Sequence, residues 1–130
     1  MQLTKLRILY AEDHEDTREF VNLILKRSNY EVIAMESGAA ALDLARAGEH
    51  FDLYLLDTKL PDVSGIELCQ KIREFDAWTP ILFFSGVAHE DDKQKALSCG
   101  AQGYLTKPDG ISEIAQTVSQ LIEKAHALHH

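Results

Sequence analysis

Short apolar runs recur along this chain, and each is followed by a stretch whose apolar residues are spaced as on one face of a helix. Runs of this length are typical of buried strands, and spacings of three and four are typical of amphipathic helices. The pattern predicts five strands and five helices in strict alternation. The expected strands span 6–10, 31–35, 51–56, 80–84 and 102–106, and the expected helices span about 15–26, 39–45, 66–75, 90–98 and 112–127.

This alternation favours an α/β fold with one parallel sheet and helices on both faces, because each parallel crossover needs a helix. The run over 51–56 is almost entirely apolar, as expected of a central strand that is covered on both sides. Alternation alone does not choose between the two common strand orders. The five-strand count and the short length favour the flavodoxin-like order 2-1-3-4-5, in which the first and third strands are neighbours. Ser37 is placed to cap the second helix, and Gly48 to end it.

Length and composition indicate a single soluble domain over residues 1–130, without an output domain. The hydrophobic content of 45% is ordinary, and no apolar run approaches the roughly 18 residues needed to cross a bilayer. The first residues lack the features of a secretion signal. We therefore expect a cytoplasmic protein without membrane insertion.

Charge and cysteine usage exclude further classes of function. A net charge of −8, with basic residues scattered along the chain, argues against direct binding of nucleic acid. Cys69 and Cys99 have no metal-ligand spacing, so both are expected to be buried free thiols. The C-terminal histidines, His126, His129 and His130, fit no ligand pattern with a second cluster and are left out of the expected site.

Four of the expected strands are followed by residues that bind metal or phosphate in proteins. These residues are Glu12 and Asp13, Asp57, Ser85, and Lys107. Because the carboxyl ends of parallel strands meet at one edge of a sheet, the side chains are expected to converge. Adjacent carboxylates repel one another unless a cation lies among them, and Mg²⁺ suits a site with few carboxylates and several waters. The set predicts a Mg²⁺ site next to a phosphoryl-binding site.

Asp57 is the natural nucleophile of this set, because it stands alone at the end of the central strand. Attack of its carboxylate on phosphorus would give an acyl phosphate held by Mg²⁺, the Ser85 hydroxyl and the Lys107 ammonium. Glu12 and Asp13 would share the metal, one directly and one through water.

The same residues lie in motifs that resemble those of the receiver domain of bacterial two-component response regulators, and the resemblance covers essentially the whole chain. The motifs are Glu12-Asp13, the run 55–65 around Asp57, Ser85-Gly86 and Lys107-Pro108. The resemblance implies phosphorylation of Asp57 by a sensor histidine kinase or a histidine phosphotransfer protein. It also implies dependence on Mg²⁺ and only slow self-catalysed hydrolysis, so that the domain is a signalling phosphoprotein and not a turnover enzyme.

Further expectations come from the resemblance alone. The Lys59 backbone carbonyl would be a metal ligand, and the Lys107–Pro108 bond would be cis. Ser85 would move toward the phosphoryl group, and Tyr104 would turn inward to fill the space left behind. The face formed by 90–127 is then the expected contact surface for a downstream effector protein.

Other functions remain open on this architecture. A phosphohydrolase with an aspartyl nucleophile usually needs a second acid two residues later, where this chain has Lys59. A flavodoxin-like cofactor binder needs a phosphate loop after the first strand, where residues 12–16 are mostly acidic. A scaffold that has lost phosphorylation is disfavoured, because every site residue is present. The sequence also leaves open an intermediate relay to a histidine, and a receiver fragment of a longer regulator.

Overall fold

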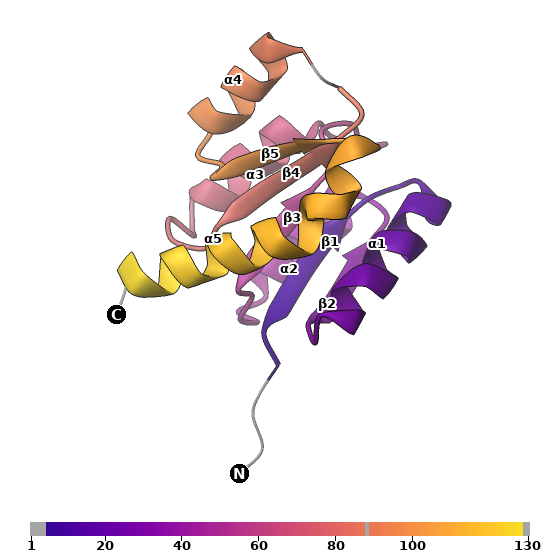
Figure 1. Cartoon of the computed structure of the whole chain (residues 1–130). Coiled ribbons are helices and arrows are strands. Elements are labelled where there is room, and N and C mark those ends of the chain that lie inside the picture. Colours follow the sequence, from indigo (N-terminus) through magenta and orange to yellow (C-terminus); the bar gives the residue numbers. More distant parts are fainter. Residues whose placement is uncertain (1–4, 88, 129–130) are drawn as a thin grey trace.

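The computed structural model describes residues 5–87 and 89–128, and within them all five strands form one parallel sheet (Figure 1). The strand order β2-β1-β3-β4-β5 confirms the predicted flavodoxin-like order. The strands are β1 Arg7–Ala11, β2 Glu31–Met35, β3 Leu53–Leu56, β4 Ile81–Ser85 and β5 Gly103–Thr106. The helices are α1 Glu15–Arg27, α2 Gly38–Arg46, α3 Gly65–Arg73, α4 Glu90–Ser98 and α5 Ile114–Leu128, with a short 3₁₀ helix η1 Asp109–Glu113 before α5.

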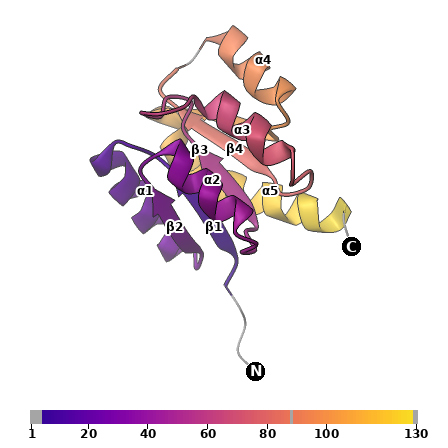
Figure 2. The same cartoon turned by 180° about the vertical axis from the view of Figure 1, so that it is seen from behind.

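Helices cover both faces of the sheet, with α1 and α5 on one side and α2 and α3 on the other (Figures 1 and 2). Alternate side chains of each strand enter opposite layers of the core. In β1, Ile8 and Tyr10 pack with α1 and α5, whereas Leu9 and Ala11 pack with α2 and α3. The central strands are thus buried from both sides, which makes them rigid supports for the residues at their ends.

The expected elements differ from the structure mainly at their ends. β3 begins at Leu53, and Asp52 just before it bonds to Arg7 of β1 through both its backbone and its side chain. The last helix begins at Ile114, because Asp109–Glu113 winds as a 3₁₀ helix first. β1 lies one residue later than expected, and α3 ends at Arg73. The predicted caps of α2 are confirmed, since Ser37 accepts a hydrogen bond from the Ala40 N–H at 3.2 Å and Gly48 follows the helix with φ +85°.

α4 is the least buried of the helices. Ala96 is its one buried residue, and the side chain of its N-cap, His89, makes no capping hydrogen bond. Both cysteines are free thiols, as expected, but only Cys69 is buried, because Cys99 lies at the end of α4 near the surface. Among the described residues, no helix is long and apolar enough to cross a membrane.

The loop before β4 is organised around the carboxylate of Asp76. It accepts hydrogen bonds from the backbone N–H groups of Trp78 and Thr79, both at 3.0 Å. It also accepts hydrogen bonds from the hydroxyls of Tyr54 at 2.9 Å and Thr79 at 2.7 Å. Burial alone would raise the pKa of Asp76, but the hydrogen bonds outweigh it and hold the pKa below its usual value.

Replacing Asp76 with Ala should therefore lower the free energy of unfolding at neutral pH by about 2 kcal/mol, because its donors lose a charged acceptor. A depressed folded-state pKa contributes stability above the unfolded pKa of about 3.9, and this contribution is lost as the pH falls through the lower folded value. Urea unfolding of parent and Asp76→Ala should show a stability gap that narrows as the pH is lowered below about 4. A gap that stays constant with pH would contradict the role of the ionised carboxylate.

Candidate functional site

Side chains at the ends of β1, β3 and β5 converge at one edge of the sheet. Carboxylate oxygens of Glu12, Asp13 and Asp57 all lie within 4.8 Å of one another. The Lys107 Nζ donates to Oε1 of Glu12 at 2.5 Å and to Oδ2 of Asp57 at 3.0 Å. The Lys107–Pro108 peptide that carries this amine is cis. The structure thus brings together the acidic groups and the ammonium that the sequence singled out.

Burial makes the charges of this cluster interact strongly. Glu12 and Asp57 are buried, while Asp13 is exposed. Burial raises the pKa of Glu12, and the nearby Asp57 charge adds to this, whereas the hydrogen bond from Lys107 opposes it. Burial lowers the pKa of Lys107, but its ion pairs with Glu12 and Asp57 together outweigh burial and hold the pKa above its usual value. One ammonium therefore serves two buried carboxylates, which leaves a net negative site suited to a further cation.

Two residues that sequence reasoning missed hold the acidic pair in place. Arg18, in the first turns of α1, donates to the backbone carbonyls of Glu12 at 3.0 Å and Asp13 at 3.3 Å. The Tyr10 hydroxyl donates to Oε1 of Glu12 at 3.4 Å from within the core. Arg18 follows the acidic pair closely in the sequence. A basic residue at this spacing is the sequence feature from which the contact could have been predicted.

The loop after β3 wraps around Asp57. The Lys59 N–H donates to Oδ1 of Asp57 at 3.2 Å, and the Gly65 N–H donates to the Thr58 carbonyl at 2.8 Å. Gly65 approaches this backbone so closely that a Cβ atom would overlap the Asp57 carbonyl oxygen. Only glycine fits such an approach, and it keeps the Asp57 backbone in position. Farther along the loop, Asp62 accepts hydrogen bonds from two N–H groups at the start of α2.

A series of hydrogen bonds leads from Thr58 through the end of β4 to β5. The hydroxyls of Thr58 and Ser85 lie 2.5 Å apart, and the Val87 N–H donates to the Ser85 hydroxyl at 3.1 Å. The Tyr104 hydroxyl in turn donates to the Val87 carbonyl at 2.6 Å. Ser85 is buried at the expected edge, and its hydroxyl is held by Thr58, a residue that the sequence analysis did not select although it directly follows Asp57.

Comparison with known proteins agrees with this architecture. Residues 8–119 match the family model of the response regulator receiver domain. The chain is 34% identical over 124 residues to the cell cycle response regulator CtrA of Brucella ovis, an alignment that covers 94% of this chain and 53% of that protein. The chain thus spans about half the length of the curated relatives that it matches.

Solved structures show the same fold. A CheY-like response regulator receiver domain protein from Methanospirillum hungatei superimposes with a TM-score of 0.89 at 25% identity, covering 95% of this chain and 98% of that chain. The non-phosphorylated HemR receiver domain from Leptospira biflexa gives a TM-score of 0.83 at 30% identity, covering 91% and 94%.

Proposed function

Because this chain belongs to the response regulator receiver domain family of two-component systems, we propose that it accepts a phosphoryl group on Asp57. The observation that supports this most strongly is the convergence of three carboxylates within 4.8 Å, with the Lys107 amine 3.0 Å from Asp57. Such a site can hold a divalent cation and a phosphoryl group side by side. The donor would be a sensor histidine kinase or a histidine phosphotransfer protein.

The residues of the site fit Mg²⁺, since a hard cation prefers carboxylate, carbonyl and water oxygens. Glu12, Asp13, Asp57 and the Lys59 carbonyl would hold the ion, whose charge would offset that of the phosphoryl oxygens. One carboxylate oxygen of Asp57 forms the bond to phosphorus while the bond from phosphorus to the donor's leaving group breaks. The Lys107 ammonium, already bound to Asp57, is placed to neutralise a phosphoryl oxygen.

Intact mass after incubation with acetyl phosphate tests this function. The parent protein should gain the mass of one phosphoryl group in Mg²⁺ and none in EDTA. Asp57→Asn should gain none in either condition, because an amide is a poor nucleophile. Asp62→Asn is the matched control, since Asp62 lies in the same loop but contacts α2, and it should be phosphorylated like the parent. Uptake by Asp57→Asn, or uptake without metal, would contradict the proposal.

The effect of phosphorylation would be transmitted from the site through Ser85, Val87 and Tyr104. If the Ser85 hydroxyl turned toward a phosphoryl group on Asp57, the Val87 N–H would lose its acceptor. The loop after β4 would then rearrange, and with it the bond from Tyr104 to the Val87 carbonyl. Tyr104 would follow into the vacated space, and a downstream effector protein would recognise the changed surface of α4, β5 and α5.

Tyr104→Ala should leave phosphorylation of Asp57 within about threefold of the parent rate, because its side chain does not contact the phosphoryl site. It should abolish most of the change in amide hydrogen exchange over 86–98 that phosphorylation causes in the parent. Tyr30→Ala, in the opposite core layer, is the control and should keep that response. This switch would be contradicted if phosphorylation changed amide hydrogen exchange equally in the parent and in Tyr104→Ala, or if both phosphorylated proteins bound the effector equally.

A further inference from the structure

Two cysteines from different helices meet where α4 ends. Cys69, in α3, is completely buried, whereas Cys99 caps the end of α4 and is partly exposed. The Cys69 Sγ donates to the backbone carbonyl of Cys99 at 3.4 Å, and the Cys99 Sγ donates to the Ala96 carbonyl at 3.0 Å. Both thiols are therefore held against the last turn of α4, one from α3 and one from α4 itself.

Arg73 brings a positive charge to this pair. It lies one helical turn after Cys69 in α3, and its Nε and Nη2 donate to the Gly100 carbonyl at 3.1 and 2.9 Å. Gly100 directly follows Cys99 in the chain. A guanidinium near a thiol stabilises the thiolate, which is the nucleophilic form of cysteine. The charge is thus bonded to the backbone next to the more accessible thiol.

The two thiols differ in acidity. The hydrogen bond between them and burial both raise the pKa of Cys69. The same hydrogen bond lowers the pKa of Cys99, and Arg73 adds to this, although burial opposes it. The more accessible thiol is therefore the one that ionises more readily. An accessible thiol of lowered pKa beside a second cysteine is the arrangement of redox-sensing sites.

We propose that Cys69 and Cys99 form a reversible disulfide in response to hydrogen peroxide. The Cys99 sulfur, once ionised, no longer donates to Ala96 and is free to turn. It would attack one peroxide oxygen and become a sulfenic acid, while the O–O bond breaks and hydroxide leaves. The Cys69 sulfur would then bond to the Cys99 sulfur, and the Cys69 proton and the sulfenic hydroxyl would leave as water. Two thiols thus lose two electrons to one peroxide, and exchange with a dithiol would restore them.

The disulfide would attach the end of α4 covalently to α3. α4 has a single buried residue, Ala96, so a covalent bond would restrict this helix strongly. The consequence for signalling rests on the proposed function, in which α4 belongs to the surface that an effector recognises. Oxidation would then weaken the response of this surface to phosphorylation of Asp57.

Intact mass after treatment with hydrogen peroxide, in EDTA to exclude metal-catalysed oxidation, tests the disulfide. The parent should lose the mass of two hydrogens and regain it with dithiothreitol. Cys99→Ser should lose none. Cys69→Ala should stop at the sulfenic acid, which dimedone would trap on Cys99. Cys99→Ser alters a partly exposed side chain, so it serves even if Cys69→Ala fails to fold.

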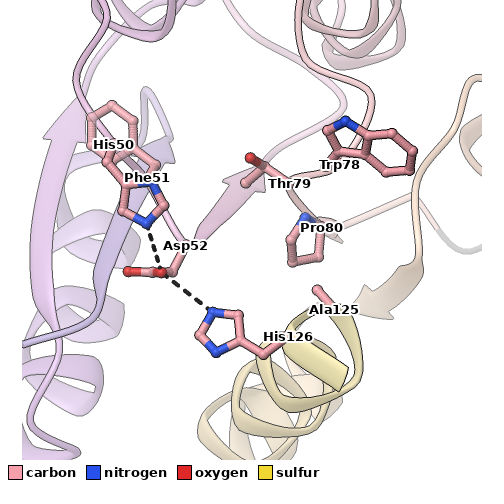
Figure 3. Close-up of a pocket in the computed structure, with 8 residues that line it drawn as sticks. All are labelled: His50, Phe51, Asp52, Trp78, Thr79, Pro80, Ala125 and His126. Atoms are coloured by element: carbon pink, nitrogen blue, oxygen red, sulfur yellow. Dashed lines mark hydrogen bonds and ion pairs between the residues drawn. The ribbon is translucent and has the colours of Figure 1, made fainter. Parts of the chain in front are cut away.

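Urea unfolding followed by tryptophan fluorescence measures the effect on the fold. Trp78 is the single tryptophan of the chain, and it lies in the wall of a cavity where β3 and β4 begin (Figure 3). The oxidised parent should unfold at a higher urea concentration than the reduced parent, because a cross-link restricts the unfolded chain. Cys99→Ser should unfold at the same urea concentration with and without peroxide treatment.

Amide hydrogen exchange over 90–98 should slow on oxidation of protein that carries no phosphoryl group, so the attachment of α4 is tested without phosphorylation. If the reduced parent took up no phosphoryl group, the proposed function would fail while the disulfide stood. A parent that keeps both thiols in peroxide would overturn the inference. Disulfides formed only between two copies of the chain, and equally in Cys69→Ala, would overturn it as well.

Discussion

Lys107→Met should lower the free energy of unfolding of the metal-free protein by about 3 kcal/mol. The Lys107 amine bridges Glu12 and Asp57, whose side chains are 1% and 10% exposed. Without the amine, two buried carboxylates face each other with no counter-ion, and burying unpaired charge is costly. Urea unfolding in EDTA measures the loss directly. Phosphorylation from acetyl phosphate should slow in parallel, because the phosphoryl oxygens lose a positive partner.

Two further measurements separate electrostatics from packing at this position. Asp57→Asn introduced into Lys107→Met should restore much of the lost stability, because it removes one of the two opposed charges. Lys59→Met is the matched control, since Lys59 is an exposed lysine in the adjacent loop, and its effect should stay within about 0.5 kcal/mol. If Lys107→Met changed the free energy of unfolding as little as Lys59→Met, the ion pairs of Lys107 would not stabilise the fold.

Gly65→Ala should slow phosphorylation at least about tenfold and lower the free energy of unfolding by about 2 kcal/mol. The new methyl group would overlap the carbonyl of Asp57 and lie 2.9 Å from the Thr58 Cα, so the backbone of the nucleophile must shift. A small displacement of a reacting group is enough to reduce the rate strongly. Intact mass against time with acetyl phosphate, and urea unfolding, give the two quantities.

Gly86→Ala is the control for this substitution. Gly86 directly follows Ser85 at the same edge of the sheet, yet a Cβ atom there would meet no other atom within 4 Å. Its phosphorylation rate should stay within about threefold of the parent rate, because nothing at the site is displaced. If Gly65→Ala slowed phosphorylation as little as Gly86→Ala, the close approach of Gly65 to the Asp57 backbone would not be what positions Asp57.

The sequence predicted a parallel sheet and the convergence of Glu12, Asp13, Asp57 and Lys107 because both follow from periodicity, whereas the strand order was inferred from the strand count and the short length. Strands with helices between them run parallel, and parallel strands end at a common edge. The caps of α2 at Ser37 and Gly48 were also predictable, since capping depends on residues next to the helix.

Contacts that depend on how helices dock were not predictable in the same way. Thr58 reaches Ser85 only because the ends of the neighbouring strands β3 and β4 are in register. His126 meets Asp52 because α5 continues across the sheet to the far edge, which no local pattern encodes. The 3₁₀ turn before α5 likewise differs from an α-helix in hydrogen bonding and not in composition.

Because α4 is only shallowly packed, it can move more easily than the buried sheet. Ala96 is the only fully buried residue of α4, so moving this helix would expose little apolar area and would leave the sheet intact. Two positions of α4 can therefore differ by a small free energy. In the proposed switch, a modest change in the bonds around Val87 would then be sufficient to favour one of these positions. The proposed phosphorylation site thus lies at the ends of buried strands, and the proposed effector surface includes the least buried helix.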